Sequence, residues 1–358
     1  MTMTTKIPVG VLGATGTVGQ RFVQLLADHP WFEVTAVTGS ERTVGRPYGE
    51  GVQWKIEGEP PADIGELIVQ PTTTDLALEG KPPLVFSALP TELAREVEPQ
   101  FAAAGFAVFT NASPFRLTPD VPLLIPEVNP DHLGLVETQR AKRGWPGFIV
   151  ANANCSTTSA ILPLKIWQDA FGLEAALMVT LQAISGAGYP GVASLDIMDN
   201  VIPHIGGEDG KLESEPKKLL GKFANGQVDW ADIKLSAQAN RVPVVDGHLA
   251  SVSVKLGRSA SAAEGIAALE EWQPDTVYRE LPSGLARPLR YQPAPDRPQP
   301  RLDRDAGAGL AWTVGKVRPC DVLDLRFLAL AHNTLRGAAS GSILNAELAV
   351  VMDYIATF

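Results

Sequence analysis

The sequence predicts an α/β protein in which a doubly wound, parallel sheet of the Rossmann type is joined to a second domain of the α+β class. Near the N-terminus, an apolar run, a glycine-rich turn and an amphipathic stretch follow one another. Apolar runs and helical stretches then alternate as far as residue 133, and residues 249–256 alternate between apolar and polar side chains. A chain of 358 residues also exceeds one ordinary core, which favours two domains.

The first element is a strand over residues 7–12, and a helical pattern occupies residues 20–26. Between them lies a turn with the spacing G-x-x-G-x-x-G, a variant of the dinucleotide-binding fingerprint. Glycines let the backbone approach a pyrophosphate that lies on the helix N-terminus; the alternative is a glycine turn that arose by chance. The predicted cofactor-binding residues here are Gly13, Ala14, Thr15, Gly16, Thr17, Val18 and Gly19.

The second strand, residues 32–37, should end near the adenosine ribose of such a cofactor. NAD sites usually have a carboxylate at this strand end, whereas here hydroxyl groups and an arginine follow. Ser40, Arg42 and Thr43 suit a 2′-phosphate, so NADP is favoured over NAD, although Glu41 leaves NAD as an alternative.

Further strands are expected at residues 67–69, 84–89 and 107–109, with helical stretches around 92–97 and 101–104. Ser87 and Ala88 would then lie in a loop on the cofactor side of the sheet. The composition changes near residues 126–134, so we predict a dinucleotide-binding domain from residues 1–133 plus 333–358 and a second domain from residues 134–332. A helix is expected over 258–275, starting near Ser259 or Ser261, and the proline- and arginine-rich stretch 281–309 should be ordered.

Cys155 lies where a strand over residues 148–150 gives way to a helix that runs to Trp167. A thiol at such a corner lies beside unpaired backbone N–H groups and the positive end of the helix dipole, which both favour the thiolate. The same N–H groups could stabilise an oxyanion. We therefore predict Cys155 as a nucleophile rather than a small buried residue, and Cys320 as structural.

A thiolate nucleophile needs a partner for its proton, and the chain has five histidines. We predict His248, because a turn with Gly247 places it at the edge of a strand; His204 beside two glycines is a second candidate near the site. A single histidine is more often structural than catalytic. No His/Cys cluster has metal-ligand spacing, so no metal is expected.

Composition argues against two classes of partner, although local basic pockets stay open as an alternative. A net charge of −10 argues against a nucleic-acid or anionic-membrane surface, and no apolar run reaches transmembrane length. The segment Met1–Lys6 lacks the pattern of a signal peptide. Two cysteines make a disulfide framework improbable and favour a reducing cytoplasm.

Together these motifs resemble the aspartate-semialdehyde dehydrogenase family, in the branch found in archaea and fungi. The resemblance runs along nearly the whole chain. It is carried by segments 13–19, 111–116, 152–158, 182–188, 241–248 and 333–338.

The resemblance implies a reaction. Cys155 would attack the aldehyde, the thiohemiacetal would give a hydride to NADP, and inorganic phosphate would release L-aspartyl-4-phosphate from the thioester, with His248 as acid/base. The cell would run the reverse, reductive reaction to L-aspartate-4-semialdehyde, in the biosynthesis of lysine, threonine, methionine and isoleucine. The family assembles through its second, catalytic and dimerisation domain, which implies a homodimer or homotetramer.

The resemblance also implies roles for the remaining site residues. Arg241 would bind the substrate carboxylate, Glu208 its amino group, and Lys211 with Arg116 the phosphate. On spacing alone, Glu208 and Lys211 would be a solvated helix start. The other substrate-binding residues would be Asn111, Asn154 and Gln182, and the other cofactor-binding residues Ser185, Gly186 and Asn333, the last orienting the nicotinamide.

Three alternatives stay open at this point. A malonyl-coenzyme A reductase of the same fold would keep the cysteine, the histidine and NADP, and an N-acetyl-glutamyl-phosphate reductase is more distant. A non-enzymatic NADP sensor would lack the nucleophile or base, which are both present. Glu208 favours aspartate semialdehyde, because only a substrate with an ammonium group uses that carboxylate.

Overall fold

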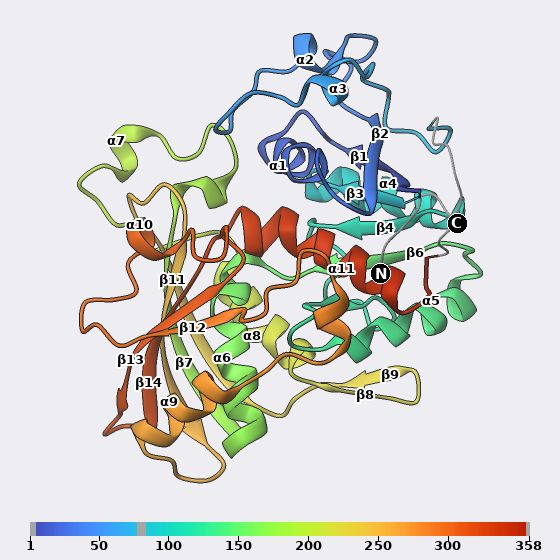
Figure 1. Ribbon diagram of the computed structural model, residues 1–358. Coiled ribbons are helices and arrows are strands. Elements are labelled where there is room, and N and C mark those ends of the chain that lie inside the picture. Colours follow the sequence, from blue (N-terminus) through green and yellow to red (C-terminus); the bar gives the residue numbers. More distant parts are fainter. Residues whose placement is uncertain (1–4, 77–83, 356–358) are drawn as a thin grey trace.

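The computed structural model describes residues 5–76 and 84–355, which form two large sheets with helices around and between them (Figure 1). Most of the segment compared above with a signal peptide, residues 1–4, and the end of the C-terminal segment, residues 356–358, lie outside the described residues. Within the described part, no helix is long and apolar enough to cross a bilayer.

The first sheet is parallel throughout, in the order β2, β1, β3, β4, β6, β5, which confirms the predicted doubly wound architecture. The inner strands are buried on both faces because helices cover both faces, whereas the edge strand β2 exposes Glu33. The strands are β1 (Ile7–Leu12), β2 (Phe32–Val37), β3 (Leu84–Ser87), β4 (Ala107–Thr110), β5 (Leu123–Leu124) and β6 (Phe148–Asn152). The helices of this part are α1 (Thr17–Leu26), α2 (Tyr48–Gly51), α3 (Ala62–Gly65), α4 (Thr91–Ala103), α5 (Leu135–Arg143) and α11 (Ser340–Val351).

Two expectations about strands are wrong. Residues 67–69 form no strand; they contribute a single isolated bridge, between Ile68 and Pro47. The strand before Cys155, expected in the second domain, is β6 of the first sheet, where Phe148 pairs with Ala107 of β4. All five residues of β6 are buried, so the strand belongs between neighbours in a sheet covered on both faces.

The second sheet is mixed and has the order β10, β7, β11, β14, β13, β12. Its strands are β7 (Leu173–Gln182), β10 (Lys234–Arg241), β11 (His248–Leu256), β12 (Leu289–Gln292), β13 (Trp312–Pro319) and β14 (Leu325–Ala331). The helices here are α6 (Cys155–Phe171), α7 (Ser194–Ile197), α8 (Glu208–Leu219), α9 (Ala262–Glu271) and α10 (Pro300–Asp303), and a hairpin joins β8 (Lys222–Ala224) to β9 (Gln227–Asp229).

Two predictions in this region are confirmed, the first with shorter bounds. The helix expected over residues 258–275 is α9, which begins after Ser261, whose side chain forms a capping box with Glu264, and ends at Glu271. The stretch 281–309 is ordered, since β12 pairs in parallel with β13 at the sheet edge and α10 follows it.

Helix α6 connects the two sheets. It starts directly after β6 and packs against β7, β11 and β14 of the second sheet (Figure 1). One hydrophobic core accordingly contains Val108 and Ile149 of the first sheet together with Leu164 of α6 and Val252 and Phe327 of the second. The corner that carries Cys155 is therefore fixed by both domains.

The glycine turn before α1 depends on a close backbone contact. A Cβ added to Gly19 would lie 2.2 Å from the carbonyl oxygen of Gly13, whereas one added to Gly16 would lie 3.7 Å from that oxygen. We expect Gly19→Ala to lower the free energy of unfolding by about 1–3 kcal/mol, because the turn must open to admit the methyl group. The matched variant Gly16→Ala should change it by less than about 1 kcal/mol. Urea denaturation of the protein purified without cofactor measures both values, and equal losses would contradict the steric argument.

Candidate active site

Cys155 is the first residue of α6, and the residue before it caps the helix. The side-chain oxygen of Asn154 accepts hydrogen bonds from the backbone N–H groups of Ser156 (3.0 Å) and Thr157 (3.1 Å). The thiol thus lies at the positive end of a 17-residue helix, in the strand-to-helix corner that the sequence predicts.

His248, the first residue of β11, brings its Nε2 to 3.4 Å from the sulfur of Cys155. The backbone N–H of Ala183 donates to the other ring nitrogen, Nδ1, over 3.1 Å. In the neutral ring the hydrogen is therefore on Nε2 and faces the sulfur. Burial, together with the positive charge of Arg241, lowers the pKa of His248 to about 3, so the ring is neutral at physiological pH.

The thiol itself behaves differently from the sequence-based expectation. Burial and, to a smaller extent, the negative charge of Glu208 raise the pKa of Cys155 to about 11, although Arg116, Ser156 and Lys211 act in the opposite direction. The helix N-terminus was expected to favour the thiolate. That expectation is wrong, because the pKa of Cys155 is raised, by burial first and by the nearby carboxylate of Glu208 second.

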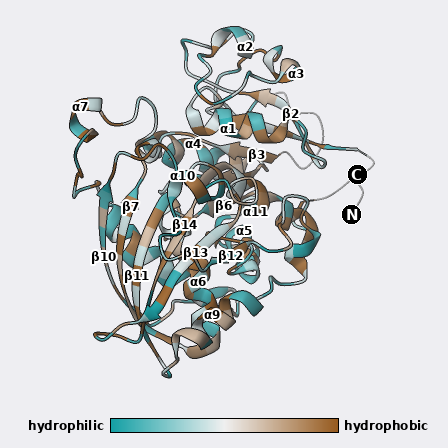
Figure 2. Ribbon diagram, turned by 60° about the vertical axis from the view of Figure 1, so that its left-hand side comes forward, coloured by the Kyte–Doolittle hydropathy of each residue, from teal (hydrophilic) through white to brown (hydrophobic). Residues whose placement is uncertain are grey.

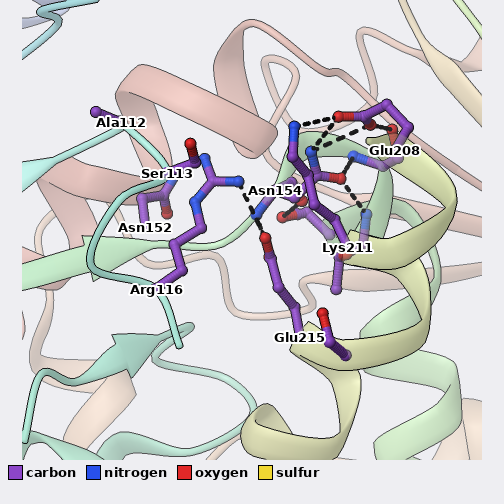
Figure 3. Close-up of polar contacts among 12 residues, drawn as sticks. Ala112, Ser113, Arg116, Asn152, Asn154, Glu208, Lys211 and Glu215 are labelled. Atoms are coloured by element: carbon purple, nitrogen blue, oxygen red, sulfur yellow. Dashed lines mark hydrogen bonds and ion pairs between the residues drawn. The ribbon is translucent and has the colours of Figure 1, made fainter. Parts of the chain in front are cut away.

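The carboxylate of Glu208 is the centre of the polar network, as Figure 3 shows. It begins α8, is buried, and accepts hydrogen bonds from the side chains of Asn154 (3.1 Å), Ser156 (3.0 Å), Gln182 (3.3 Å) and Lys211 (2.7 Å). Burial tends to raise the pKa of Glu208, but Lys211 and the other donors outweigh burial and lower it. The group is therefore an ionised carboxylate held by four donors.

Arg241 ends β10 and lies behind the loop that follows β7. Its guanidinium donates to the carbonyl oxygen of Ala183 over 2.7 Å, so Ala183 connects Arg241 with the ring of His248. A Cβ added to Gly186 would lie 2.8 Å from Nη1 of Arg241 and 3.0 Å from Cε1 of His248. Only a glycine lets this loop lie against both side chains.

A cavity of about 430 Å³ opens beside the sulfur. The predicted site residues that line it are Val18, Ala88, Asn111, Arg116, Asn154, Cys155, Ser185, Gly186, Glu208, Lys211 and Asn333. Gln182, Arg241 and His248 lie behind this lining and reach it through their hydrogen bonds to Glu208, to the loop after β7 and to Cys155. Asn333 is fixed from both sides, accepting from the N–H of Gly247 (2.8 Å) and donating to the hydroxyl of Ser185 (2.8 Å).

The structure of the glycine turn suits a dinucleotide. Gly13 has a φ of +72°, and a Cβ there would lie 3.0 Å from the carbonyl oxygen of Ala88. Gly16 caps α1 without a side chain, so the N–H groups of the first turn stay open to a phosphate group. Ser40, Arg42 and Thr43 form an exposed turn at the end of β2, where Thr43 donates to the carbonyl oxygen of Ser40.

Three observations differ from the sequence reading or add to it. His204 is exposed and has no place in the network around the sulfur. Ser87 is buried at the end of β3, so only its neighbour Ala88 faces the cavity. Glu215 was missed: its carboxylate bonds the backbone of Asn154, and its position seven residues after Glu208, on the same helix face, was the signal that could have identified it.

Family models and individual relatives point to the same protein family. Residues 8–136 match the model described as semialdehyde dehydrogenase, NAD binding domain, and residues 164–336 match semialdehyde dehydrogenase, dimerisation domain. An aspartate-semialdehyde dehydrogenase of Archaeoglobus fulgidus is 52% identical over 348 residues, covering 96% of this chain and 98% of that protein. An aspartate-semialdehyde dehydrogenase from Cryptococcus neoformans is 46% identical over 354 residues, covering 96% of this chain and 97% of that protein.

Solved structures agree with these relatives. The crystal structure of aspartate semialdehyde dehydrogenase with NADP from Candida albicans is 38% identical, has a TM-score of 0.89 and covers 98% of this chain and 100% of its own. The crystal structure of an aspartate semialdehyde dehydrogenase II from Vibrio cholerae, complexed with ASA, is 25% identical and has a TM-score of 0.76. It covers 98% of this chain and 100% of its own.

The raised thiol pKa predicts how Cys155 reacts. In a Cys320→Ser background, the rate of alkylation by iodoacetamide should be low at neutral pH and still rising at pH 10, because a pKa of about 11 leaves little thiolate below that. Glu208→Gln should shift the profile to lower pH, since it removes a negative charge that raises the pKa. Alkylation that is already independent of pH near neutrality would contradict the prediction. Cys155→Ala identifies the background rate.

Proposed function

Because this chain belongs to the aspartate-semialdehyde dehydrogenase family and is an oxidoreductase of that family, we propose that it catalyses the reversible, NADP-dependent reduction of L-aspartyl-4-phosphate to L-aspartate-4-semialdehyde and phosphate. The observation that supports the chemistry best is the pair of Cys155 and His248, 3.4 Å apart at the start of α6. Two cations, Arg116 and Lys211, line the same cavity. The step belongs to the biosynthesis of lysine, threonine, methionine and isoleucine.

In the reductive direction, the thiolate of Cys155 attacks the C4 carbonyl, the C–O bond to phosphate breaks, and a thioester forms on the sulfur. Bound NADPH is the source of the hydride that reduces this thioester. The resulting thiohemiacetal oxyanion collapses, the C–S bond breaks, and the aldehyde leaves as the thiolate returns. The proton of the Cys155 thiol leaves with the departing phosphate, and the returning thiolate takes up the one proton that the overall reaction consumes, so the cycle leaves Cys155 as the thiol it began as.

His248 acts in this proposal at a single atom. Ala183 occupies Nδ1, so Nε2 presents its hydrogen to the sulfur of Cys155 in the resting pair. The same hydrogen stabilises the substrate oxygen when negative charge develops there. This role is the acid side of the acid/base function that the sequence suggested.

The polar groups around the cavity suit the three charged ends of the substrate. Lys211 and Arg116 would bind the phosphate group, with Asn111 beside them, and Glu208 the ammonium group. Arg241 would bind the carboxylate, while Asn154 and Gln182, which share Glu208 as acceptor, would hold the substrate next to the sulfur.

The cofactor would lie along the opposite wall. The backbone of the turn from Gly13 to Gly19 would bind the pyrophosphate, and Ser40, Arg42 and Thr43 the 2′-phosphate. Ala88, Ser185, Gly186 and Asn333 would place the nicotinamide beside Cys155; they line the cavity that contains the thiol. The relative from Candida albicans, solved with NADP, supports this cofactor.

The decisive assay is phosphate-dependent reduction of NADP with aspartate semialdehyde, followed by NADPH absorbance. We expect activity that needs phosphate and is abolished in Cys155→Ala. His248→Ala should lose roughly a hundredfold or more, and His248→Gln should lose less, because its amide N–H can replace the donated hydrogen of Nε2. NADPH oxidation with malonyl-coenzyme A instead would assign the rival reductase reaction. Inactivity with both substrates would refute the enzymatic proposal.

The open face of the second sheet is the proposed interface of a homodimer or homotetramer. Helix α6 covers one face, and no helix lies over the other in the part of the chain described (Figure 2). On that open face the apolar side chains of β7 are exposed: Leu177 by 48%, Val179 by 43% and Leu181 by 37%. An exposed apolar patch on a sheet fits a self-complementary contact, and residues 164–336 match a dimerisation domain.

Val179→Asp should therefore shift the protein toward the monomer in analytical ultracentrifugation, because a charge would be buried in the contact. Glu174→Asp, at an exposed position near the start of β7, is the control and should leave the mass unchanged. An unchanged mass in Val179→Asp would place the interface elsewhere.

A further inference from the structure

Helix α8 carries charged side chains at positions 208, 211, 215 and 218, so that all four lie on one face of the helix. The first two belong to the site described above. The other two, Glu215 and Lys218, are 1% and 0% exposed, and the proposed chemistry does not use them. A buried carboxylate and a buried ammonium are costly unless their partners compensate, so those partners indicate what the two side chains do.

Glu215 joins two segments that flank the cavity (Figure 3). One carboxylate oxygen accepts the backbone N–H of Asn154 over 2.7 Å, next to Cys155 in the chain. The other accepts a hydrogen bond from Nη1 of Arg116 over 3.1 Å. A single side chain thus spans the turn with the thiol and the guanidinium proposed to bind phosphate.

Arg116 has few other restraints. Its Nη2 donates to the carbonyl oxygen of Asn111 over 2.7 Å, and its Nε is buried without a hydrogen-bond partner among the described residues. The side chain lines the cavity together with Lys211. Without the carboxylate of Glu215, one hydrogen bond to a loop carbonyl would hold a guanidinium that can rotate about several bonds.

Lys218 restrains the backbone of the same loop. Its ammonium group donates to the carbonyl oxygens of Arg116 (2.9 Å), Thr118 (2.7 Å) and Val121 (2.7 Å). Helix α8 therefore fixes both the main chain and the side chain of Arg116, one turn apart. Of these two residues, Lys218 contacts only the backbone of Arg116, whereas Glu215 contacts its guanidinium.

We propose that Glu215 is a positioning residue that holds the guanidinium of Arg116 against the Cys155 turn, so that the phosphate group is bound next to the sulfur. The inference rests on the proposed function, since it assigns the role of Arg116 to phosphate. Charge is essential to this role. A glutamine could accept from Asn154 with its oxygen, but its NH2 group would then face the NH2 of Arg116 and repel it.

Steady-state kinetics of Glu215→Gln provide the test, in the oxidative direction. We expect the KM for phosphate to rise by roughly tenfold to a hundredfold, as on losing the charged partner of a buried pair, with little change in the KM for aspartate semialdehyde. Glu213→Gln is the matched control: it lies on the same helix but accepts from the N–H of Ala237 (3.0 Å) in β10, and it should match the wild type. In an Arg116→Ala background, Glu215→Gln should add little, because the residue acts through Arg116.

Other outcomes overturn the inference. Equal rises in both KM values, or effects that add fully to those of Arg116→Ala, would make Glu215 a structural residue only. Binding of inorganic phosphate to Cys155→Ala, with and without Glu215→Gln, is measured by calorimetry and does not depend on turnover. If the wild type shows no phosphate-dependent activity, the proposed function fails. Weaker phosphate binding in the Glu215→Gln protein would still support the positioning role of Glu215. Unchanged phosphate binding would refute that role. Urea denaturation confirms that each variant is folded.

Discussion

Asn154 is the residue on which the arrangement of the site depends. Its oxygen caps α6, its NH2 group donates to Glu208, and its backbone N–H donates to Glu215. Both carboxylates come from α8, so one helix holds the corner from two directions. The corner also separates β6, a strand of the first sheet, from α6, which packs on the second sheet. The position of the thiol is thereby set by both domains at once, as a site between a cofactor domain and a substrate domain requires.

The charges of the site balance one another before any substrate is bound. Glu208 pairs with Lys211, and Glu215 pairs with Arg116. This balance lets Glu208, Glu215 and Arg116 lie buried beside the half-buried Lys211. It also leaves Cys155 without a dominant positive neighbour, so burial keeps it a thiol. In the proposed reaction, a substrate ammonium group bound at Glu208 would offset the carboxylate that raises the pKa of the thiol, and so would increase the fraction of thiolate.

The sequence predicted the cofactor fold and the cysteine corner, because each has a local signal: a glycine turn between a strand and a helix, and a strand followed at once by a helix. It also predicted a helix starting near Ser259 or Ser261, and the structure adds the capping box that fixes this start. Other features had no local signal. The apolar run at residues 148–150 fits either sheet, and only pairing with β4 assigns it to the first. The raised pKa of Cys155 arises from side chains distant in sequence, such as Glu208. The restraint of His248 comes from a backbone N–H, which no residue type reveals.

The segment after β14, which leads the chain back to the first sheet, passes beside Cys155 and so connects the packing of the two sheets with the site. Residues 335–339 form a π-helical turn before α11, and a Cβ added to Gly337 would lie 2.8 Å from the Cβ of Cys155. Asn152 reaches across to the carbonyl oxygen of Ala338 over 3.2 Å and donates to Asn111 over 3.0 Å. The segment therefore lies directly against Cys155 on its way back to the first sheet, with no room for a side chain at Gly337. The same backbone that returns the chain to the first sheet forms one wall beside the thiol, so the packing of the two sheets also sets the space around Cys155.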